Sequence, residues 1–450
     1  SAACATGEEA VSLAALARCC DTIRPSLLVA VDCGTTSVAE AEWLRARGID
    51  LIIADHHQIP ERMPPCHAMV NPFRGDHDHH LCAAGLAFKL SHALPKVLGD
   101  RCIDLREHLD LVALGTIADI VPLVDDNRIL ARAGLARIAS SVKPRLRHLL
   151  RVARVSDEPT TFDAGFKLAP RINAAGRLDD AMAAVRLLPT PDDAGASRPA
   201  QELDARNRER QGIEKAALAG AMTRAETGFD EGRDHAIVLA DRDWHPGIIG
   251  LLASRIQQRF WRPTFIVSVS PDGRGKGSGR SVEGCHLVEG LRHCSEHLES
   301  FGGHALAAGL YVRETAISPF REAFNEWAGS RLHGELRTAP LHLDAEIRLA
   351  EADWPFMRAL ASLSPFGQGN PEPVFLVRDV RLARPPTIVG DHHVKLSLLQ
   401  DGPPVEAIAF RMADRGFPEE AFDIAATPAE DRYWGPPRIV WRLRDFRAAA

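Results

Sequence analysis

LLVAVD (Leu27–Asp32) and IDLIIAD (Ile49–Asp55) are the two runs that decide how the first part of this chain folds. A helix-like stretch from Gly34 through Arg47 separates them. Two apolar runs joined by one helix predict a βαβ unit with parallel strands. In such sheets ligands bind beyond the carboxyl ends of the strands, where both runs place an aspartate. We therefore expect an α/β domain with a polar site at this sheet edge.

The composition is that of a globular protein with several cores. The chain has 450 residues, of which 45% are hydrophobic and 25% charged, so two to four domains are expected. No membrane span or signal peptide is visible, which predicts a cytoplasmic protein. Nine cysteines without a Cys-x-x-Cys pattern argue against a zinc ribbon or a disulfide framework. The net charge of -6 means that any nucleic acid must bind to local basic patches.

The remaining patterns divide the chain further. Apolar helical patterns at Ala83–Leu98 and Leu105–Ile117 are expected to cover the sheet, and the segment Thr190–Pro199, rich in Pro and Asp, indicates a domain boundary. The charged stretch Gln201–Thr227, with Glu202 and Arg206 at i,i+4, predicts a long solvated linker helix. A second α/β region begins with the strand Ala236–Ala240, and short β-like runs with Pro/Gly turns follow from about Leu341, as in a small barrel. The predicted domains are 1–197, 198–228 (the linker helix), 229–335 and 336–450.

Carboxylates and imidazoles gather in the first domain, at Asp32, Asp55-His56-His57 and Asp119. Mixed oxygen and nitrogen ligands favour Mn²⁺ or Mg²⁺. Two such ions, roughly 3.5–4 Å apart, activate water and stabilise an in-line phosphoryl displacement. The alternative for any single aspartate is that it caps the following helix. That alternative is weaker for the adjacent histidines, because two polar rings at a strand mouth need partners.

Several longer motifs resemble one family. VDCG (Val31–Gly34), ADHH (Ala54–His57) and GTIADIVPL (Gly115–Leu123) are similar to the second, third and fourth motifs of the DHH phosphoesterases. PRINAAGRLDDA (Pro170–Ala181) and HPGIIGLLASR (His245–Arg255) resemble the RecJ branch, the single-stranded-DNA-specific exonucleases, and the overall match spans nearly the whole chain.

The resemblance assigns roles residue by residue. Asp32 would bridge two ions, His56 and Asp119 would bind one of them, and His57 would contact the scissile phosphate, with Asp55 orienting a histidine from behind. A second copy of the triplet, Asp391-His392-His393, lies in a β-like context without strand-end carboxylates, and we interpret it as a barrel loop. The cluster Asp76 to His80 follows Pro72 and Gly75, and we interpret it as a solvated loop.

The second domain carries two glycine-rich segments. GKGSGRS (Gly275–Ser281) predicts an anion nest at Gly279 and Ser281 with a charged contact from Arg280, and the alternative is a tight turn. Gly302-Gly303-His304 lets a backbone approach closely and adds an imidazole. Together they resemble the DHHA1 domain, in which Arg and Gly-Gly-His elements reach the substrate phosphate across a cleft. The segment from Arg255 to Arg280 contains six basic residues and one acidic residue, which predicts a nucleic-acid-binding surface. Phe260 and Trp261 lie within it, either to stack bases or as core packing at a helix end.

The third domain decides between substrates. SPFGQGNPEPVF (Ser364–Phe375) resembles the start of the OB-type barrel of RecJ, which favours long single-stranded DNA over dinucleotides or pyrophosphate. A purely structural barrel is the alternative, because few exposed aromatic residues are identifiable there. The family further implies 5′ to 3′ digestion to mononucleotides and partners such as a helicase and a single-strand-binding protein.

One departure from the family concerns the first motif, Asp-x-Asp-x-Asp-Gly. Only 31 residues precede Asp32, and their acids are Glu8, Glu9 and Asp21. We therefore expect the chain to be a truncated form of an active exonuclease whose two-ion site is incomplete and whose activity is impaired. Two alternatives stay open: a non-catalytic nucleic-acid-binding or replication scaffold, and a small-substrate phosphatase or oligoribonuclease. Alanine at His56 would leave the activity of a scaffold unchanged. Deletion of residues 341–450 would leave the activity of a small-substrate phosphatase or oligoribonuclease unchanged.

Overall fold

The computed structural model describes most of the chain. The described residues are 13–75, 80–99, 104–141, 143–178, 182–188, 192–332, 338–390, 392–432 and 435–449. They form two compact units, and each unit is described by itself. One unit contains 25–140, 157–165 and 341–450, and the other contains the residues up to Arg24, 141–156 and 166–340.

The expected βαβ unit is confirmed. Strand β1 (Leu27–Val31), helix α2 (Val38–Arg45) and strand β2 (Asp50–Ala54) follow one another, and β1 pairs with β2 in parallel. Strand β3 (Ala68–Val70) adds a third parallel strand, giving the order β1-β2-β3. Ile53 in the central strand is fully buried, as an apolar run between two neighbours requires. All three strands therefore end at the same sheet edge.

Helices bring the fourth motif to this domain. The 3-10 helix Pro72–Arg74 leads to α3 (Ala83–Leu98), and a second one, Leu105–His108, leads to α4 (Leu109–Ala118) and α5 (Asp125–Ala139). Helices α4 and α5 pack closely at Gly134, where an added Cβ would lie 2.1 Å from the Leu109 carbonyl oxygen. Leu86, Val112 and Leu130 form an apolar cluster among α3, α4 and α5. This packing fixes the end of α4, and with it Asp119.

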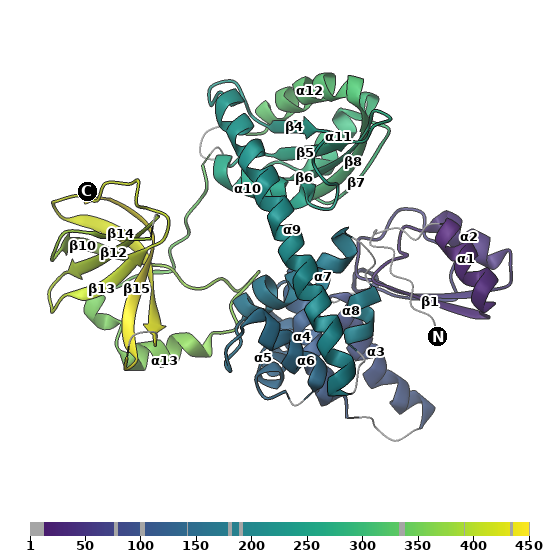
Figure 1. Cartoon of the computed structure of the whole chain (residues 1–450), viewed down its shortest axis with the longest axis horizontal. Helices are drawn as coiled ribbons and strands as arrows, with labels where there is room; N and C mark the ends of the chain where they lie inside the picture. Colours follow the sequence, from purple (N-terminus) through teal and green to yellow (C-terminus); the bar gives the residue numbers. More distant parts are fainter. Residues whose placement is uncertain are drawn as a thin grey trace. The chain divides into compact units, whose positions relative to one another are not determined.

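The other unit contains α1 (Leu13–Ile23) and a group of helices packed against one long helix, α9 (Asp193–Gly228). This group is α6 (Pro144–Ala153), α7 (Ala169–Leu178) and α8 (Met182–Leu187), and a π-helix (Asp163–Leu168) crosses the unit boundary. Figure 1 shows α9 running from α6, α7 and α8 to β4 and α10. The helix begins earlier than the predicted Gln201, at Asp193, where Asp192 accepts a hydrogen bond from the Gly195 N–H at 2.7 Å.

The long helix is also less solvated than predicted. Ala196, Ala200 and Leu203 are fully buried near its start, and Ala221 near its end. Glu202 was expected to pair with Arg206, but its carboxylate instead forms an ion pair with Arg198, with Oε1 3.0 Å from the arginine Nε. The buried residues form a narrow apolar stripe on a helix that also carries many charged residues. The overall composition of the helix is polar, so composition alone does not predict the stripe.

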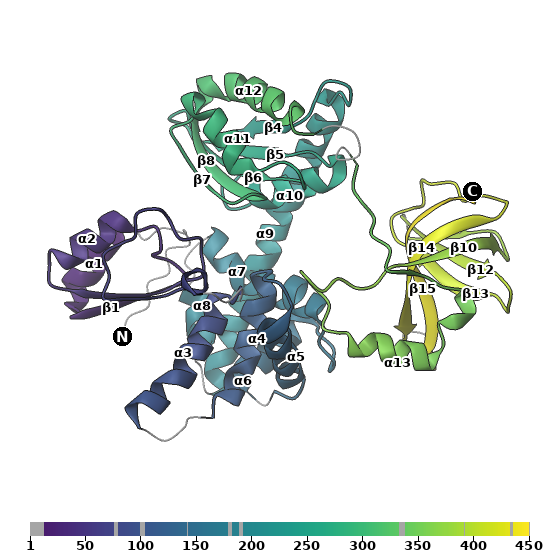
Figure 2. The same ribbon diagram turned by 180° about the vertical axis from the view of Figure 1, so that it is seen from behind.

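A five-stranded sheet follows, in the order β4-β5-β6-β8-β7. Its elements are β4 (Ile237–Asp241), α10 (Ile249–Phe260), β5 (Thr264–Val269), β6 (Arg274–Arg280), α11 (Leu287–His293), the 3-10 helix Ser295–His297, β7 (Ser300–Gly303), β8 (Ala307–Arg313), the 3-10 helix Glu314–Ala316 and α12 (Ile317–Gly329). One face packs against α9 and α10 through Ile266, and the other against α11 and α12 through Phe265. Figure 2 shows α12 and α10 on opposite sides of these strands. The expected second α/β region is confirmed.

The C-terminal part is a β-sheet that closes on itself. Its elements are β9 (Ala345–Glu346), the 3-10 helix Leu349–Glu351, α13 (Trp354–Ser362), β10 (Phe375–Leu382), β11 (Thr387–Val389), β12 (His393–Leu399), β13 (Val405–Ala409), β14 (Phe422–Asp431) and β15 (Arg438–Ala448). The order is β11-β12-β13-β15-β14-β10-β9, and a further pairing of β12 with β10 completes a ring. Trp441 and Phe422 fill its core.

The boundaries between the four predicted domains stay predictions, since the compact units join segments that are distant in sequence. No helix among the described residues is long and apolar enough to span a membrane.

Candidate metal centre

Asp32 lies at the carboxyl end of β1, where the backbone leaves the sheet. Its N–H still donates to the Ala54 carbonyl at 3.0 Å, and its φ is +64°. Gly34 follows at φ +107°, and a Cβ there would lie 3.3 Å from that of Ala30. A glycine is suited to this turn because other residues are strained at such φ values. The turn leaves the Asp32 carboxylate 61% exposed at the sheet edge.

Asp55, at the end of β2, is the buried anchor of the site. Its carboxylate is 1% exposed and accepts hydrogen bonds from the Thr35 N–H at 3.0 Å, the His56 N–H at 2.8 Å and the His57 ring nitrogen Nδ1 at 2.7 Å. Burial alone raises the pKa of Asp55, but the hydrogen bonds from His57 and Thr35 outweigh it and hold this pKa well below its usual range. Asp55 is therefore a carboxylate that orients His57, as expected.

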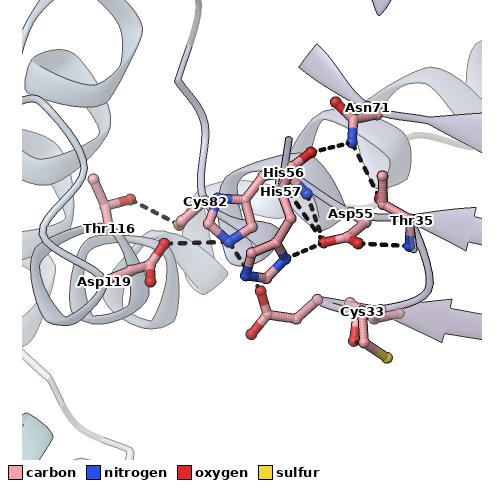
Figure 3. Close-up of polar contacts among 11 residues, drawn as sticks. Cys33, Thr35, Asp55, His56, His57, Asn71, Cys82, Thr116 and Asp119 are labelled. Carbon is pink, nitrogen blue, oxygen red and sulfur yellow. Dashed lines mark hydrogen bonds and ion pairs between the residues drawn. The ribbon is translucent and has the colours of Figure 1, made fainter. Parts of the chain in front are cut away.

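His56 meets two carboxylates from different elements. Its Nε2 lies 3.0 Å from Asp32 Oδ1 and 3.4 Å from Asp119 Oδ2, and Asp119 caps the end of α4 (Figure 3). Burial lowers the pKa of His56, but the hydrogen bond to Asp32 and the charge of Asp119 raise it overall. Burial also raises the pKa of Asp119, although His56 opposes this. Because two carboxylates lie next to one imidazole nitrogen, a positive charge between them would be stabilised, whether it is a proton or a metal ion.

Asn71 is a residue that the sequence analysis did not single out. Its side-chain amide donates to the His57 carbonyl at 3.0 Å and to the Thr35 hydroxyl at 3.3 Å, so it ties the end of β3 to the ends of β2 and β1 (Figure 3). Asn71 is 7% exposed. The available signal was its place directly after the apolar run Ala68–Val70.

These side chains fit a divalent metal ion. Ligand atoms of Asp32, His56 and His57 all lie within 4.8 Å of one another, and Asp119 adds a carboxylate next to His56. Imidazole nitrogen with carboxylate oxygens is a donor set that suits Mn²⁺. Among the residues that the structure describes, no other group of three possible ligands is present.

The two other histidine clusters have different surroundings. His393 Nδ1 accepts a hydrogen bond from the Arg411 N–H at 3.1 Å, and its ring packs edge-on against Phe410. Asp391 lies outside the described residues, as do residues 76–79, so the interpretations of both loops stay predictions.

The predicted anion nest at GKGSGRS is wrong. The segment forms β6, which pairs with β5 on one side and β8 on the other, so its backbone amides belong to the sheet. The glycines make room for core side chains instead: a Cβ on Gly279 would lie 2.3 Å from the Phe265 ring. The tight turn given as the alternative is equally wrong. Ser281 is also occupied, because its hydroxyl donates to the Cys285 carbonyl at 2.6 Å and its N–H to the Leu306 carbonyl.

Arg280 and His304 lie at the same end of this sheet. Arg280 is paired with Ala307 across β6 and β8, and the His304 N–H donates to the Ala307 carbonyl at 2.7 Å. The Arg280 guanidinium donates to the Gly279 carbonyl at 2.7 Å, and His304 is exposed.

The two glycines before His304 differ in their surroundings. Gly303, at φ +136°, leaves no space for a Cβ, which would lie 2.5 Å from the Ala307 carbonyl oxygen, whereas a Cβ on Gly302 would meet nothing within 4 Å. The close backbone approach predicted for this segment is therefore found at Gly303.

The predicted nucleic-acid-binding surface is smaller than its count of basic residues in the sequence indicates. Arg262 is 1% exposed and donates to the Trp261 carbonyl, so it is part of the core. Arg274 pairs with Glu299 at 2.8 Å. Phe260 packs edge-on against Phe229, which favours the core alternative for this ring.

The C-terminal ring has a basic strip that the sequence analysis missed. Lys395 and Arg438 flank Glu406, at 3.2 and 2.7 Å, and Arg442 and Arg444 flank Glu372. Arg438, Arg442 and Arg444 recur at even spacing along β15, which was the available signal. Phe410 and Trp354 are 48% and 40% exposed, so aromatic residues are present as well.

Comparisons with known proteins agree with these domains. The chain matches the family models of the DHH family N-terminal domain at residues 4–116, the DHHA1 domain at 233–330 and the RecJ OB domain at 343–445.

Individual relatives extend the similarity over most of the chain. The single-stranded-DNA-specific exonuclease RecJ of Escherichia coli is 37% identical over 87% of the chain and 72% of its own length. RecJ of Bacillus subtilis is 35% identical over 86% of the chain, which spans 49% of that protein. The crystal structure of Thermus thermophilus RecJ with Mn²⁺ superposes with a TM-score of 0.84 at 33% identity, covering 94% of the chain and 62% of that structure. A structure of the same protein with Mg²⁺ gives a TM-score of 0.79.

Proposed function

Since this chain belongs to the RecJ family of single-stranded-DNA-specific exonucleases, we propose that it hydrolyses phosphodiester bonds of single-stranded DNA with the help of Mn²⁺ or Mg²⁺. The observation that carries the proposal is the meeting of Asp32, His56 and Asp119 at the carboxyl edge of a parallel sheet.

In this proposal Asp32, His56 and Asp119 hold the metal ion. When bound, such ions lower the pKa of water and balance the charge of phosphate oxygens. Asp55 fixes the His57 ring through the 2.7 Å contact to Nδ1, which supports a role for the opposite side of the ring at the scissile phosphate. Asn71 holds the backbone of His57 in the same orientation.

The second set of groups comes from the sheet β4–β8. We propose that Arg280 and His304 bind a substrate phosphate, next to the exposed backbone of Gly302 and Gly303. Their shared sheet end supports this, and so does the fork geometry of a guanidinium, which matches phosphate oxygens. The basic strip on β12 and β15 supports binding of further nucleotides by phosphate contacts, and the exposed Phe410 supports stacking.

The resemblance adds finer points to the proposal: digestion from 5′ to 3′, a helicase and a single-strand-binding protein as partners, and a cytoplasmic location. A labelled strand blocked at one end or the other tests the direction.

Metal binding is the first test. Mn²⁺ titrated into the purified chain is followed by the electron paramagnetic resonance signal of the free ion. We expect His56→Ala and Asp119→Asn to weaken Mn²⁺ binding by at least about a hundredfold, more than the loss of an outer partner would. His67→Ala, an exposed histidine near β3, is the matched control and should bind Mn²⁺ normally. If the parent chain bound Mn²⁺ no better than His56→Ala, the assignment of the site would fail.

Hydrolysis is the second test. A labelled single-stranded oligonucleotide is incubated with the chain and Mn²⁺, and its shortening is measured on gels. Arg280→Met should raise KM by about tenfold to a hundredfold, since hydrogen bonds to charged groups contribute about 1.5–3 kcal/mol. Arg292→Met, an exposed arginine of α11, is the control. Equal KM values for both variants would refute the role of Arg280, and hydrolysis unaffected by His56→Ala would refute the reaction proposed.

A further inference from the structure

The backbone directly after Asp119 is strained. Ile120 has φ +58° and its side chain is 69% exposed. A β-branched residue rarely adopts this conformation, and glycine is the usual residue one position after a helix cap. Such a conformation costs of order 1–3 kcal/mol and persists only where the surroundings enforce it. The position of Asp119 therefore depends on whatever holds the residues that follow Ile120.

The segment after Ile120 is held partly by residues close to it in the sequence. Val121 and Leu123 are 9% and 2% exposed, and the Asn127 side chain donates to the Pro122 carbonyl at 3.0 Å. These contacts fix the inner side of the segment Val121–Val124.

The outer side is held by a distant segment of the chain, Ser362–Asn370, which joins α13 to β10. The Leu123 N–H donates to the Gln368 carbonyl at 2.6 Å. Gly367 lies so close that an added Cβ would be 2.7 Å from Leu123 Cδ1. Gly369, at φ +72°, approaches Pro122, and a Cβ there would lie 3.0 Å from that of the proline. Both glycines are thus needed for close contact with the loop after Asp119.

Two side chains fasten the same segment to the first domain. The Arg128 guanidinium in α5 donates to the carbonyls of Ser362 and Leu363 at 3.1 and 3.0 Å, and the Thr161 hydroxyl donates to the Phe366 carbonyl at 2.7 Å. Figure 1 shows the chain after α13 running to the helices that include α5 before it returns to β10.

The segment is braced internally as well. The Asn370 amide donates to the Leu363 and Pro365 carbonyls, and the Gly367 N–H donates to the Asn370 carbonyl. These internal hydrogen bonds hold the backbone of the segment in one conformation, so its contacts to Pro122 and Leu123 are held together.

We propose that Ser362–Asn370 is a positioning element for the metal centre: it holds the loop after Asp119 and thereby keeps the Asp119 carboxylate next to His56. The inference rests on the proposed role of Asp119 as a metal ligand. No residue of the segment contacts the metal-binding groups; it acts through Leu123, Pro122 and the strained Ile120. The domain that carries the basic strip is consequently tied to the metal centre by the loop between α13 and β10.

The test is Mn²⁺ affinity in the full chain. Gly367→Ala pushes against the buried Leu123, and we expect Mn²⁺ binding to weaken by about tenfold, the effect typical of lost outer partners. Leu123→Val shortens the side chain and removes the Cδ1 methyl that the new Cβ would meet, so the double variant should bind Mn²⁺ more tightly than Gly367→Ala alone. Gly402→Ala, where a Cβ would meet nothing within 4 Å, is the control from the same domain. Thermal unfolding of each variant identifies any that fail to fold.

A second variant avoids the packing change. Arg128→Met removes the guanidinium contacts to Ser362 and Leu363, whereas Arg132→Met changes an exposed arginine one turn later in α5. We expect a several-fold weaker Mn²⁺ affinity only for the first. If folded Gly367→Ala and Arg128→Met both bound Mn²⁺ like the parent while Asp119→Asn did not, the positioning role would be refuted and the proposed function would stand. If Asp119→Asn also bound Mn²⁺ normally, the proposed metal site itself would be refuted.

Discussion

Replacement of Asp55 by asparagine is the sharpest perturbation of the metal centre that leaves every proposed ligand in place. The carboxylate is 1% exposed and accepts from the Thr35 N–H, the His56 N–H and the His57 ring. Asparagine has the same shape but a single acceptor oxygen, and its amide group points two hydrogens at positions now occupied by donors.

The expected cost follows from these contacts. A hydrogen bond to a charged group contributes about 1.5–3 kcal/mol, and a buried donor left without a partner costs about 1–3 kcal/mol. If one oxygen keeps its donors and the other is lost, the first domain should be destabilised by about 3 kcal/mol. Because Asp55 also fixes the backbone N–H of His56 at 2.8 Å, Mn²⁺ affinity should fall by about tenfold to a hundredfold.

Two measurements check this prediction. Denaturant unfolding gives the loss of stability, and the Mn²⁺ titration gives the loss of affinity. Asp50→Asn removes an exposed carboxylate at the other end of the same strand and should change neither quantity by much. An Asp55→Asn chain as stable as Asp50→Asn, with unchanged Mn²⁺ affinity, would show that the buried hydrogen bonds do not organise the site.

Three further predictions concern other parts of the molecule. Gly279→Ala places a Cβ 2.3 Å from the Phe265 ring and should destabilise its unit by about 1–3 kcal/mol in denaturant unfolding, whereas a flexible phosphate loop would tolerate it. Burial raises the pKa of Cys285 to about 11, so about one thiol in a thousand is ionised at pH 8. Iodoacetamide should therefore label the half-buried Cys19 before the buried Cys285, and equal labelling of the two, measured by mass spectrometry, would contradict this. Free Mn²⁺ at a hundred times its Kd should stabilise the first domain by about 2.7 kcal/mol, an increment that His56→Ala abolishes.

The βαβ unit and its site were predictable because one physical rule governs both. Parallel strands must be apolar on both faces, so LLVAV and DLIIA stand out, and the first polar residues after them must lie at the same edge. Asp119 is different: it comes from a helix end, and no spacing in the sequence places it near His56. Asp119 was a candidate by residue type, but its pairing with His56 at one ion came from the family resemblance.

The glycines of β6 show where a composition rule fails. GKGSGRS has the glycine content of a phosphate loop, but glycine is also required where a core ring lies against a strand. The two cases differ only in what lies across the sheet: Phe265, 14 residues before Gly279, and Leu310, 33 residues after Gly277. Local sequence therefore cannot separate them. The same limitation explains Gly367, whose need for close contact comes from Leu123, more than two hundred residues earlier.

The Asp-His-His triplet occurs twice in this chain, and the two copies lie in different structural surroundings. At Asp55 to His57 the triplet ends a buried strand of a parallel sheet, so a neighbouring strand delivers Asp32 and a helix delivers Asp119 to His56. At His393 the chain enters an antiparallel strand, and the ring instead accepts a backbone hydrogen bond and packs on Phe410. Antiparallel neighbours run the opposite way, so they do not end at the same edge with converging side chains. We therefore expect metal binding to depend on the strand direction around the triplet, and a transplanted Asp-His-His without parallel neighbours should bind no Mn²⁺.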